Sequence, residues 1–384
     1  MEQEILHGIE NSVRPISIAA VLSVIGYFVS MRFIPPVMQI LFDRNIYGID
    51  INKTTVETRQ QFSKARKSGA EFSDTFKKLV VPESLGIVVG GIYLCAVLLA
   101  LILAGVPLTK ANGAVTTIAV MLLLGFVDDV LDVRWRYKLI LSVFGAMPLI
   151  MGYEGALSVA VPIPLRDYIG SAFLYIGPLY LVYLVAVCVF CTNSINILAG
   201  VNGVEVGQSL VIGIASLVYN LVQLRHVDDQ TTTEQHRVAI VLLLPFIGVS
   251  FALWKFNRYP SRVFVGDSYT YFAGTVLAVA GITAVYSKTL LLLFIPQIIN
   301  FVISLPQLFH IIECPRHRVP RWIPERNVLT NSRNGTILNA LLMVFGDMHE
   351  RRLTNVVIVF QIVCSVLAFY IRYVLAGLVF ERVV

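Results

Sequence analysis

The chain consists largely of long apolar stretches that are separated by short polar segments. A stretch of about 20 apolar residues can cross the roughly 30 Å hydrocarbon core of a bilayer as a helix. Helices are expected because backbone polar groups in a bilayer need partners within their own segment. The pattern predicts ten such spans, in the ranges 13–41, 86–105, 113–130, 138–152, 171–192, 204–223, 238–256, 268–286, 289–312 and 354–380.

The composition agrees with a chain that lies in a membrane. Of its 384 residues, 57% are hydrophobic and only 14% are charged, whereas soluble domains carry about 25% charged residues. We therefore expect an all-α, polytopic integral membrane protein with about ten transmembrane helices, forming one domain over residues 1–384. The longest polar segments, 43–82 and 313–352, are expected to be loops of this domain.

The distribution of basic residues predicts the orientation. The loops after the first, third, seventh and ninth spans, with the edges of those spans, hold 21 of the 30 Lys and Arg residues. By the positive-inside rule this side is cytosolic, and both termini lie on the opposite side. The same rule accounts for the net charge of +6, so the charge does not indicate nucleic-acid binding.

The stretch GFVDDVLDVRW, residues 125–135, ends the third apolar run in three carboxylates. An Asp at the bilayer centre costs roughly 3 kcal/mol, but the run before Asp128 is long enough to bring these residues to the cytosolic interface. If the helix continues, Asp128, Asp129 and Asp132 can face one cavity. They would then need a proton, a metal or a nearby base such as Lys138. The alternative is a solvated interfacial cap.

Two further segments place amides and a carboxylate at the same side of the membrane. CTNSINILAGVNG, residues 191–203, carries Asn193 and Asn196 one turn apart and Asn202 between glycines. These amides are expected to contact a polar ligand, because nearby glycines allow close approach. Asp267 begins the eighth span, where a carboxylate also suits the helix dipole.

The segment CPRHRVPR, residues 314–321, places Arg316, His317 and Arg318 between prolines. Such a group can hold anions. An equally simple interpretation is that these bases only reflect the general excess of Lys and Arg in cytosolic loops. Taken with the carboxylates and amides, the segment predicts a cytosolic site for a phosphorylated substrate. Mg²⁺ typically uses one or two protein oxygens together with phosphate oxygens and water, and phosphoryl transfer requires mainly positioning and charge neutralisation.

GFVDDVLDVRWRYK, CTNSINILAGVNG, NRYPSRVFVGD and CPRHRVPR, in this order, resemble the eukaryotic branch of the polyprenyl-phosphate sugar-1-phosphate transferase superfamily. The likeness extends from DINKT at 50–54 to HERRLTN at 349–355. It implies an Mg²⁺-dependent enzyme of the endoplasmic reticulum membrane with a cytosolic active site and lumenal termini. The implied reaction moves N-acetylglucosamine 1-phosphate from UDP-N-acetylglucosamine to dolichyl phosphate and releases UMP, as the first step of N-glycan assembly. Inhibition by tunicamycin is expected, and a homodimer is one alternative for the oligomeric state.

The resemblance also implies roles for single residues. Asn196 and Asp267 match the magnesium ligands, and Lys138 matches the residue that binds the donor pyrophosphate. Asp128 and Asp129 match paired aspartates that deprotonate or orient dolichyl phosphate, and a role as covalent nucleophile is left open. The residues that match substrate contacts are Ile51, Glu83, Gly200, Asn202 and Phe264 for the nucleotide, Arg316, His317 and Arg318 for pyrophosphate and sugar, and Trp135 near the lipid.

One departure and two alternatives remain. In the family the DINKT and PES motifs are close together, but here residues 54–81 separate Lys53 from Pro82. We expect this polar insert to be dispensable for chemistry.

A sister transferase with a different UDP-sugar or polyprenyl acceptor is the nearest alternative to the implied function. A membrane transporter is the other, since carboxylates and amides also line transport pathways.

Overall fold

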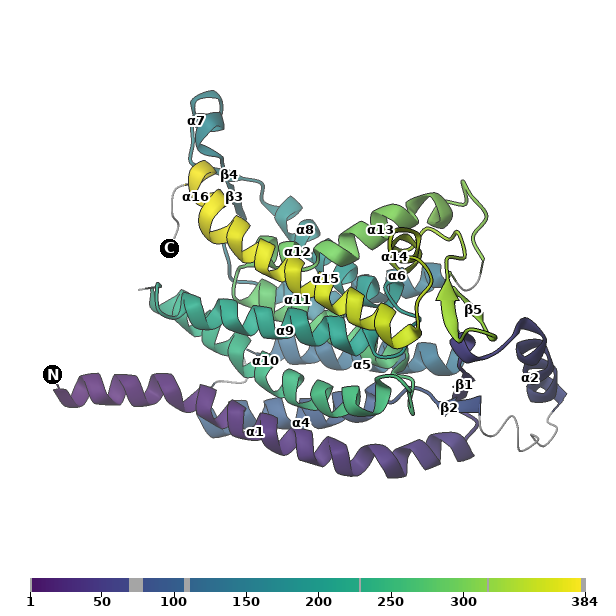
Figure 1. The fold of residues 1–384 in the computed structure, drawn as a ribbon. Coiled ribbons are helices and arrows are strands. Elements are labelled where there is room, and N and C mark those ends of the chain that lie inside the picture. Colours follow the sequence, from purple (N-terminus) through teal and green to yellow (C-terminus); the bar gives the residue numbers. More distant parts are fainter. Residues whose placement is uncertain (1, 69–78, 107–110, 228, 316–317, 381–384) are drawn as a thin grey trace.

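The computed structural model describes residues 2–68, 79–106, 111–227, 229–315 and 318–380, which form a helical bundle. Figure 1 shows its long helices side by side along one axis. The longer helices are α1 (Glu2–Asp43), α4 (Gly86–Ala104), α5 (Asn112–Leu131), α6 (Trp135–Met151), α8 (Pro178–Ile197), α9 (Val204–Gln223), α10 (Gln230–Asn257), α11 (Gly266–Thr283) and α15 (Glu350–Tyr370).

Shorter helices complete the bundle and its loops. They are α2 (Val56–Ser68), α7 (Ile163–Ile169), α12 (Ser287–Leu293), α13 (Ile295–Leu308), α14 (Ile337–Phe345), α16 (Ala376–Val379), a 3₁₀ turn (Ile51–Lys53) and a π-helical turn (Ile371–Leu375). Three small antiparallel hairpins pair β1 (Tyr47–Ile49) with β2 (Val80–Pro82), β3 (Ser158–Ala160) with β4 (Phe173–Tyr175), and β5 (Arg321–Ile323) with β6 (Val328–Thr330).

A helix overlaps each of the ten predicted spans, which confirms the all-α, polytopic fold. By length and composition, seven helices of the described chain could cross a membrane, or eight when α12 and α13, bent by 72°, count as one span. The fifth span begins later than predicted, because residues 173–175 belong to a hairpin. Neither α6, with 17 residues, nor α11 is among these helices, so the count of ten crossings stays a prediction.

Helix α11 lies at the centre of the bundle and packs against α4, α5, α8, α9 and α10. All its residues from Ser268 to Ile282 are buried. Because other helices rather than lipid surround it, α11 can carry Ser, Thr and Tyr side chains that find partners inside the protein. Small residues such as Gly274 let neighbouring helices approach closely.

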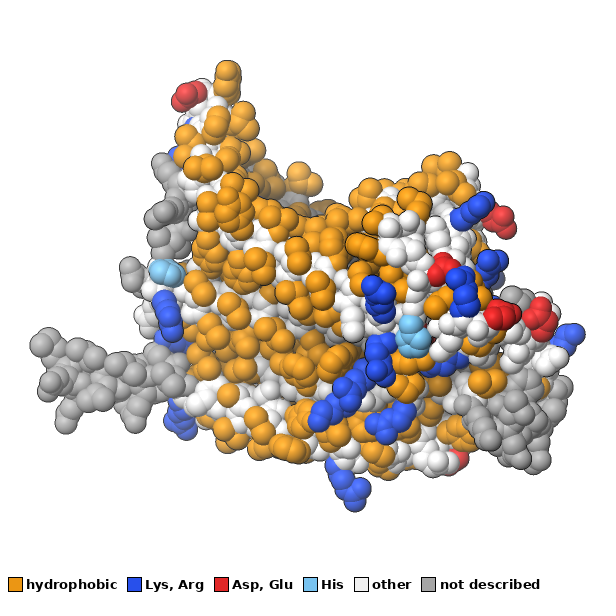
Figure 2. Space-filling view, in the orientation of Figure 1, with side chains coloured by type: hydrophobic (Ala, Val, Ile, Leu, Met, Phe, Trp, Pro, Cys, Tyr) orange, Lys and Arg blue, Asp and Glu red, His pale blue; other side chains and the backbone are white. Residues whose placement is uncertain are grey.

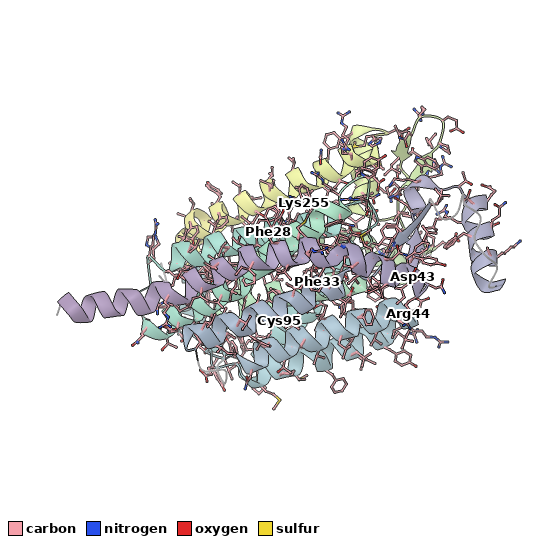
Figure 3. All side chains as sticks on the ribbon, turned by 90° about the horizontal axis from the view of Figure 1, so that it is seen from below. Phe28, Phe33, Asp43, Arg44, Cys95 and Lys255 are labelled. Carbon is pink, nitrogen blue, oxygen red and sulfur yellow. The ribbon has the colours of Figure 1, made fainter. Side chains whose placement is uncertain are left out.

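The outer surface is apolar over the middle of the bundle. Figure 2 shows hydrophobic side chains covering this part of the face and most charged side chains gathered toward the end that carries β5. On α1, Phe28 and Phe33 are 65% and 54% exposed, and Figure 3 shows both well before the charged end of the helix at Asp43. Exposed apolar surface of this extent is typical of contact with lipid.

The loops are sorted between the two ends of the bundle. The β1–β2 hairpin, α2 and β5 lie together at one end, whereas the start of α1, α7 and α16 lie at the other (Figure 1). This arrangement brings the first and ninth predicted loops to the same end. The four motifs singled out in the sequence meet there.

Candidate functional site

The carboxylates that end α5 point in different directions. Asp128 is 3% exposed, and its Oδ1 accepts a hydrogen bond from the backbone N–H of Val133 at 3.0 Å. Asp132 is exposed and ends the helix with a φ of 50°, donating its backbone N–H to the Asp128 carbonyl. The helix that was expected to bring all three aspartates to one cavity stops at Leu131, so Asp132 does not share a helix face with the other two. Asp128 and Asp129 do not line the cavity described below either, so the expectation is wrong.

Lys138 connects α5 to α11. The chain turns after Asp132 and starts α6 at Trp135, so Lys138 lies in the first turn of α6. Its Nζ lies 2.5 Å from Asp128 Oδ2 and 3.1 Å from Asp267 Oδ2. Each of these carboxylates is held near a cation, as expected for charges that are partly removed from water.

Asp129 holds the start of α11. Its carboxylate accepts hydrogen bonds from the backbone N–H groups of Asp267 and Ser268, at 2.5 and 3.1 Å. A negative charge at a helix N-terminus is stabilising because the first N–H groups have no partner in the helix. Gly266 makes this approach possible: its φ is +73°, and a Cβ there would lie 2.3 Å from Asp129 Oδ2.

Asn196 and Asp267 are adjacent, although α8 and α11 supply them separately. The Asn196 amide nitrogen donates to Asp267 Oδ1 and, at 3.2 Å, to Thr270 Oγ1. No group of three or more His, Cys, Asp or Glu in the described ranges could hold a metal ion. Mg²⁺ needs fewer protein ligands than that. A carboxylate beside an amide and a hydroxyl, at a cavity wall, fits a magnesium ion that takes its other ligands from phosphate and water.

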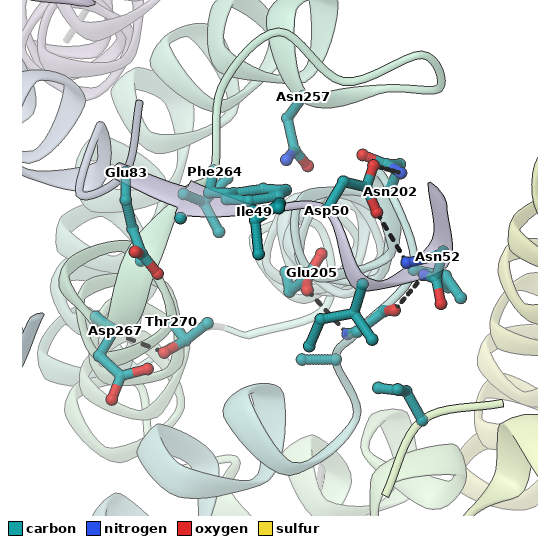
Figure 4. A pocket seen from close by; sticks show the side chains of 18 of the residues that line it. Ile49, Asp50, Asn52, Glu83, Asn202, Glu205, Asn257, Phe264, Asp267 and Thr270 are labelled. Carbon is teal, nitrogen blue, oxygen red and sulfur yellow. Dashed lines mark hydrogen bonds between the residues drawn. The ribbon is translucent and has the colours of Figure 1, made fainter. Parts of the chain in front are cut away.

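A cavity of about 620 Å³ extends from this cluster into the loops. In Figure 4, Asp267 and Thr270 lie on one side of it, and Asp50, Asn52 and Asn202 lie on the other. Its size is typical of a site for a small molecule. Predicted site residues that line it are Ile51, Glu83, Asn196, Gly200, Asn202, Phe264 and Asp267.

The β1–β2 hairpin brings the two separated motifs of the first loop together. Tyr47 pairs with Pro82, and Glu83 donates its backbone N–H to the Ile46 carbonyl at 3.2 Å. The chain therefore enters the polar insert and returns from it at neighbouring points beside β1 and β2. As a result, Ile51 and Glu83 both line the cavity. Phe264 joins this hairpin, because its N–H donates to the Pro82 carbonyl at 2.7 Å.

The helical part of the insert also contributes to the cavity. Arg59, Phe62 and Ser63 of α2 line it, and Phe62 is 6% exposed with its ring 6.3 Å from that of Tyr47. This geometry argues against our expectation that the insert is dispensable. Its polar composition gave no sign that one face of α2 packs on β1.

The turn between α8 and α9 forms another wall. Gly200 has a φ of +106°, and a Cβ there would lie 2.3 Å from Val319 Cγ1, so the turn packs directly on the segment that follows Arg318. Nη1 of Arg318 is buried and has no hydrogen-bond partner among the described residues. Burial lowers the pKa of the Arg318 guanidinium, a setting in which a nearby anion would be favourable.

Some predicted residues are not brought to the cavity. The Asn193 side chain donates to the Val189 carbonyl of its own helix at 2.8 Å, and Asn193 does not line the cavity. Trp135 is 58% exposed at the start of α6, also outside the cavity lining. Arg316 and His317 lie outside the described residues.

Sequence reasoning missed several polar residues of the site. Asp50 and Asn52 line the cavity from the DINKT motif, and Glu205 accepts a hydrogen bond from the Gly200 N–H at 3.0 Å. Glu350, the first residue of α15, bonds to both Asn52 and Asn202. Asp50, Asn52 and Glu350 stand inside motifs that carried the resemblance, which was the only signal available.

Comparison with known proteins identifies the family of this chain. The model of Glycosyl transferase family 4 matches residues 111–285, which include α5, α6 and α11. A UDP-N-acetylglucosamine–dolichyl-phosphate N-acetylglucosaminephosphotransferase of Leishmania amazonensis is 49% identical over 94% of each chain. The protein of the same name from Dictyostelium discoideum is 43% identical over 89% of this chain and 85% of its own length. The one from Saccharomyces cerevisiae is 38% identical over 71% of this chain and 70% of its own length. The chain therefore belongs to the family of UDP-N-acetylglucosamine–dolichyl-phosphate N-acetylglucosaminephosphotransferases.

Proposed function

We propose that this protein transfers N-acetylglucosamine 1-phosphate from UDP-N-acetylglucosamine to dolichyl phosphate. An oxygen of the acceptor phosphate attacks the phosphorus that carries the sugar, and the bond from that phosphorus to the bridging oxygen breaks. The products are dolichyl-pyrophosphate-N-acetylglucosamine and UMP. The observation that carries the proposal is the Lys138 ammonium, shared between Asp128 and Asp267 at one end of a nucleotide-sized cavity.

The cavity supports one orientation of the donor. Its Asp267 end is close to Lys138, which would bind the pyrophosphate. The amide-bearing turns at its opposite end would bind the base, and Phe264 lies between the two ends (Figure 4). A planar base packs well against an aromatic ring and a glycine backbone such as Gly200. The sugar phosphate would then lie nearest the α5 carboxylates.

Asp267 and Asn196 are the residues proposed to hold Mg²⁺. When bound, this ion would neutralise phosphate charge and orient the phosphate oxygens for displacement. Lys138 would balance the remaining negative charge, since its ammonium already lies 3.1 Å from Asp267. The chain's own contribution is to fix these groups before the substrates arrive, which lowers the cost of reorganisation during reaction.

Asp128 and Asp129 are proposed to have different roles. Asp129 is occupied by two backbone N–H groups of α11, so it positions Asp267. Asp128 is paired with Lys138 and would orient the acceptor phosphate or take its proton. Neither carboxylate lines the donor cavity, which favours direct attack by the lipid phosphate over a covalent enzyme intermediate.

The setting of the reaction follows the same proposal. The loops that build the cavity are rich in Lys and Arg and would face the cytosol, where UDP-sugars are available, with both termini lumenal in the endoplasmic reticulum. Tunicamycin is expected to compete with the donor. A transporter is less well supported, because transport sites usually lie near the bilayer midplane. The cavity is lined by residues of the β1–β2 region and α2, and these elements lie at one end of the bundle (Figure 1).

Purified, lipid-reconstituted protein tests the proposal. UMP release should require both UDP-N-acetylglucosamine and dolichyl phosphate. UDP-glucose, UDP-galactose and UDP-N-acetylgalactosamine should give much slower release. Equal release with another UDP-sugar would favour a sister transferase, and substrate flux across proteoliposomes without UMP release would favour a transporter.

A further inference from the structure

Glu350 joins three segments that are far apart in the sequence. It is the first residue of α15 and is 4% exposed. Its Oε1 accepts hydrogen bonds from the Asn202 backbone N–H at 2.8 Å, from Asn202 Nδ2 at 2.5 Å and from Asn52 Nδ2 at 3.2 Å. A single carboxylate oxygen therefore fixes the side-chain amides of two different loops on the same side of the donor cavity.

These contacts determine which way each amide faces. A carboxylate accepts hydrogen bonds but donates none, so the nitrogen of a neighbouring amide must turn toward it. Asp50 Oδ2 also accepts from Asn202 Nδ2, at 3.1 Å, and the Gly200 carbonyl accepts from Asn52 Nδ2 at 2.7 Å. Rotating either amide would place its oxygen against these acceptors.

The amide oxygens are left without partners. Asn52 and Asn202 are 5% and 6% exposed, both line the cavity, and neither Oδ1 has a hydrogen-bond partner within the described ranges. A buried acceptor without a partner is unfavourable and is rare in native proteins. Two of them beside one cavity indicate a ligand that supplies hydrogen-bond donors.

We propose that Glu350 is a positioning residue that makes the donor site specific for uracil. The inference rests on the proposed function, in which the donor is a uridine nucleotide. Uracil carries one ring donor, N3–H, between two carbonyl oxygens. Cytosine has a lone pair at N3 instead. With its nitrogen held by Glu350 and Asp50, Asn202 presents its oxygen as an acceptor for N3–H and opposes the cytosine lone pair.

The choice of glutamate matters for this role. Glutamine at position 350 has nearly the same shape, but its side chain can donate as well as accept. The Asn202 amide could then rotate and offer its nitrogen to the base. Glu350→Gln should therefore reduce discrimination between bases and leave the phosphate-binding end of the cavity unchanged.

The test is nucleotide binding by the full-length protein in nanodiscs, measured with UDP, CDP and N3-methyl-UDP. We expect the wild type to prefer UDP over both analogues by about 50-fold or more, because a site built for a hydrogen-bond donor rejects ligands that lack it. Glu350→Gln should lower the UDP-to-CDP ratio at least about tenfold. The KM for UDP-N-acetylglucosamine should rise by a larger factor than kcat falls, since Glu350 does not touch the reacting phosphate.

Glu234→Gln is the matched control, because Glu234 pairs with Arg237 on the surface of α10, away from the cavity. It should leave the ratio at the wild-type value. If Glu350→Gln folds poorly, Asp50→Asn provides a second test, because Asp50 is the other carboxylate that accepts a hydrogen bond from the Asn202 amide. The same loss of discrimination between UDP and CDP is expected. The wild-type comparison of UDP with N3-methyl-UDP needs no variant.

Two results would overturn the inference. One is an unchanged UDP-to-CDP ratio in folded Glu350→Gln, which would show that Glu350 only supports the structure. The other is equal affinity of the wild type for UDP and N3-methyl-UDP. If the wild type turns over UDP-N-acetylglucosamine in either case, the proposed function stands and only the role of Glu350 fails. If it binds no uridine nucleotide, both fail.

Discussion

The Lys138 ammonium lies 2.5 Å from the Asp128 carboxylate, across the corner where α5 passes into α6. The same nitrogen lies 3.1 Å from Asp267 on α11. One cation thus holds two carboxylates from separate helices at the end of the donor cavity. In the proposed reaction, Lys138 sets the charge balance of the site before and after the donor pyrophosphate binds.

Replacing Lys138 with Met should lower kcat by about 100-fold or more, because a fixed positive charge would be missing where negative charge develops. The measurement is UMP release at saturating substrates, with a melting curve to check folding. Arg136→Gln, two residues earlier and exposed, should retain wild-type activity. A Lys138→Met variant with near-normal kcat would remove Lys138 from the proposed mechanism.

The proposed metal site makes activity dependent on a divalent cation. EDTA should abolish UMP release, and added Mg²⁺ should restore it. Asp267→Asn should raise the Mg²⁺ concentration for half-maximal activity at least about tenfold, since a carboxylate is the stronger ligand for this hard cation. Asp347→Asn is the control, because Asp347 pairs with Arg326 on the surface. Identical Mg²⁺ titrations for Asp267→Asn and the wild type would contradict the assignment.

Gly266 is predicted to be irreplaceable for a backbone reason. Alanine there would adopt a left-handed conformation, which costs about 1–2 kcal/mol for an L-residue, and would meet the Asp129 carboxylate. Gly266→Ala should therefore lower both the melting temperature and kcat. Gly91→Ala, whose Cβ would meet nothing within 4 Å, should be neutral or slightly stabilising. Equal melting temperatures for the two variants would refute this account.

The insert should matter for donor binding. Arg59 lines the cavity from α2, and a cation there would attract a nucleotide diphosphate. Arg59→Ala should raise KM for UDP-N-acetylglucosamine about tenfold with little change in kcat, a difference of roughly 1.4 kcal/mol. Lys64→Ala, exposed on the same helix, should change KM less than about twofold. A deletion of residues 56–68 with wild-type KM would restore the view that the insert is dispensable.

The apolar pattern predicted the helices well because their length is set by the bilayer and their composition by lipid contact. It was less accurate for α8, whose predicted span includes residues 173–175 of a hairpin. The local spacing of Asn193 and Asn196 suggested a shared role, yet Asn193 bonds to its own helix while Asn196 meets Asp267.

The parts of the site that sequence reasoning missed depend on contacts between distant segments. Asp129 meets α11 across 138 positions, and Glu350 meets Asn202 across 148. No local periodicity reports such contacts. The resemblance to a known family supplied Asn202 and Asp267 as site residues, but not the carboxylate that orients the Asn202 amide.

The most direct test of the central claim follows the phosphorus atom. UDP-N-acetylglucosamine labelled with ³²P in the phosphate attached to the sugar should be incubated with the reconstituted protein, Mg²⁺ and dolichyl phosphate. The proposed reaction predicts that the label enters the lipid product and that the released nucleotide is unlabelled UMP. Label that stays in released UDP, with the sugar alone on the lipid, would contradict sugar-1-phosphate transfer.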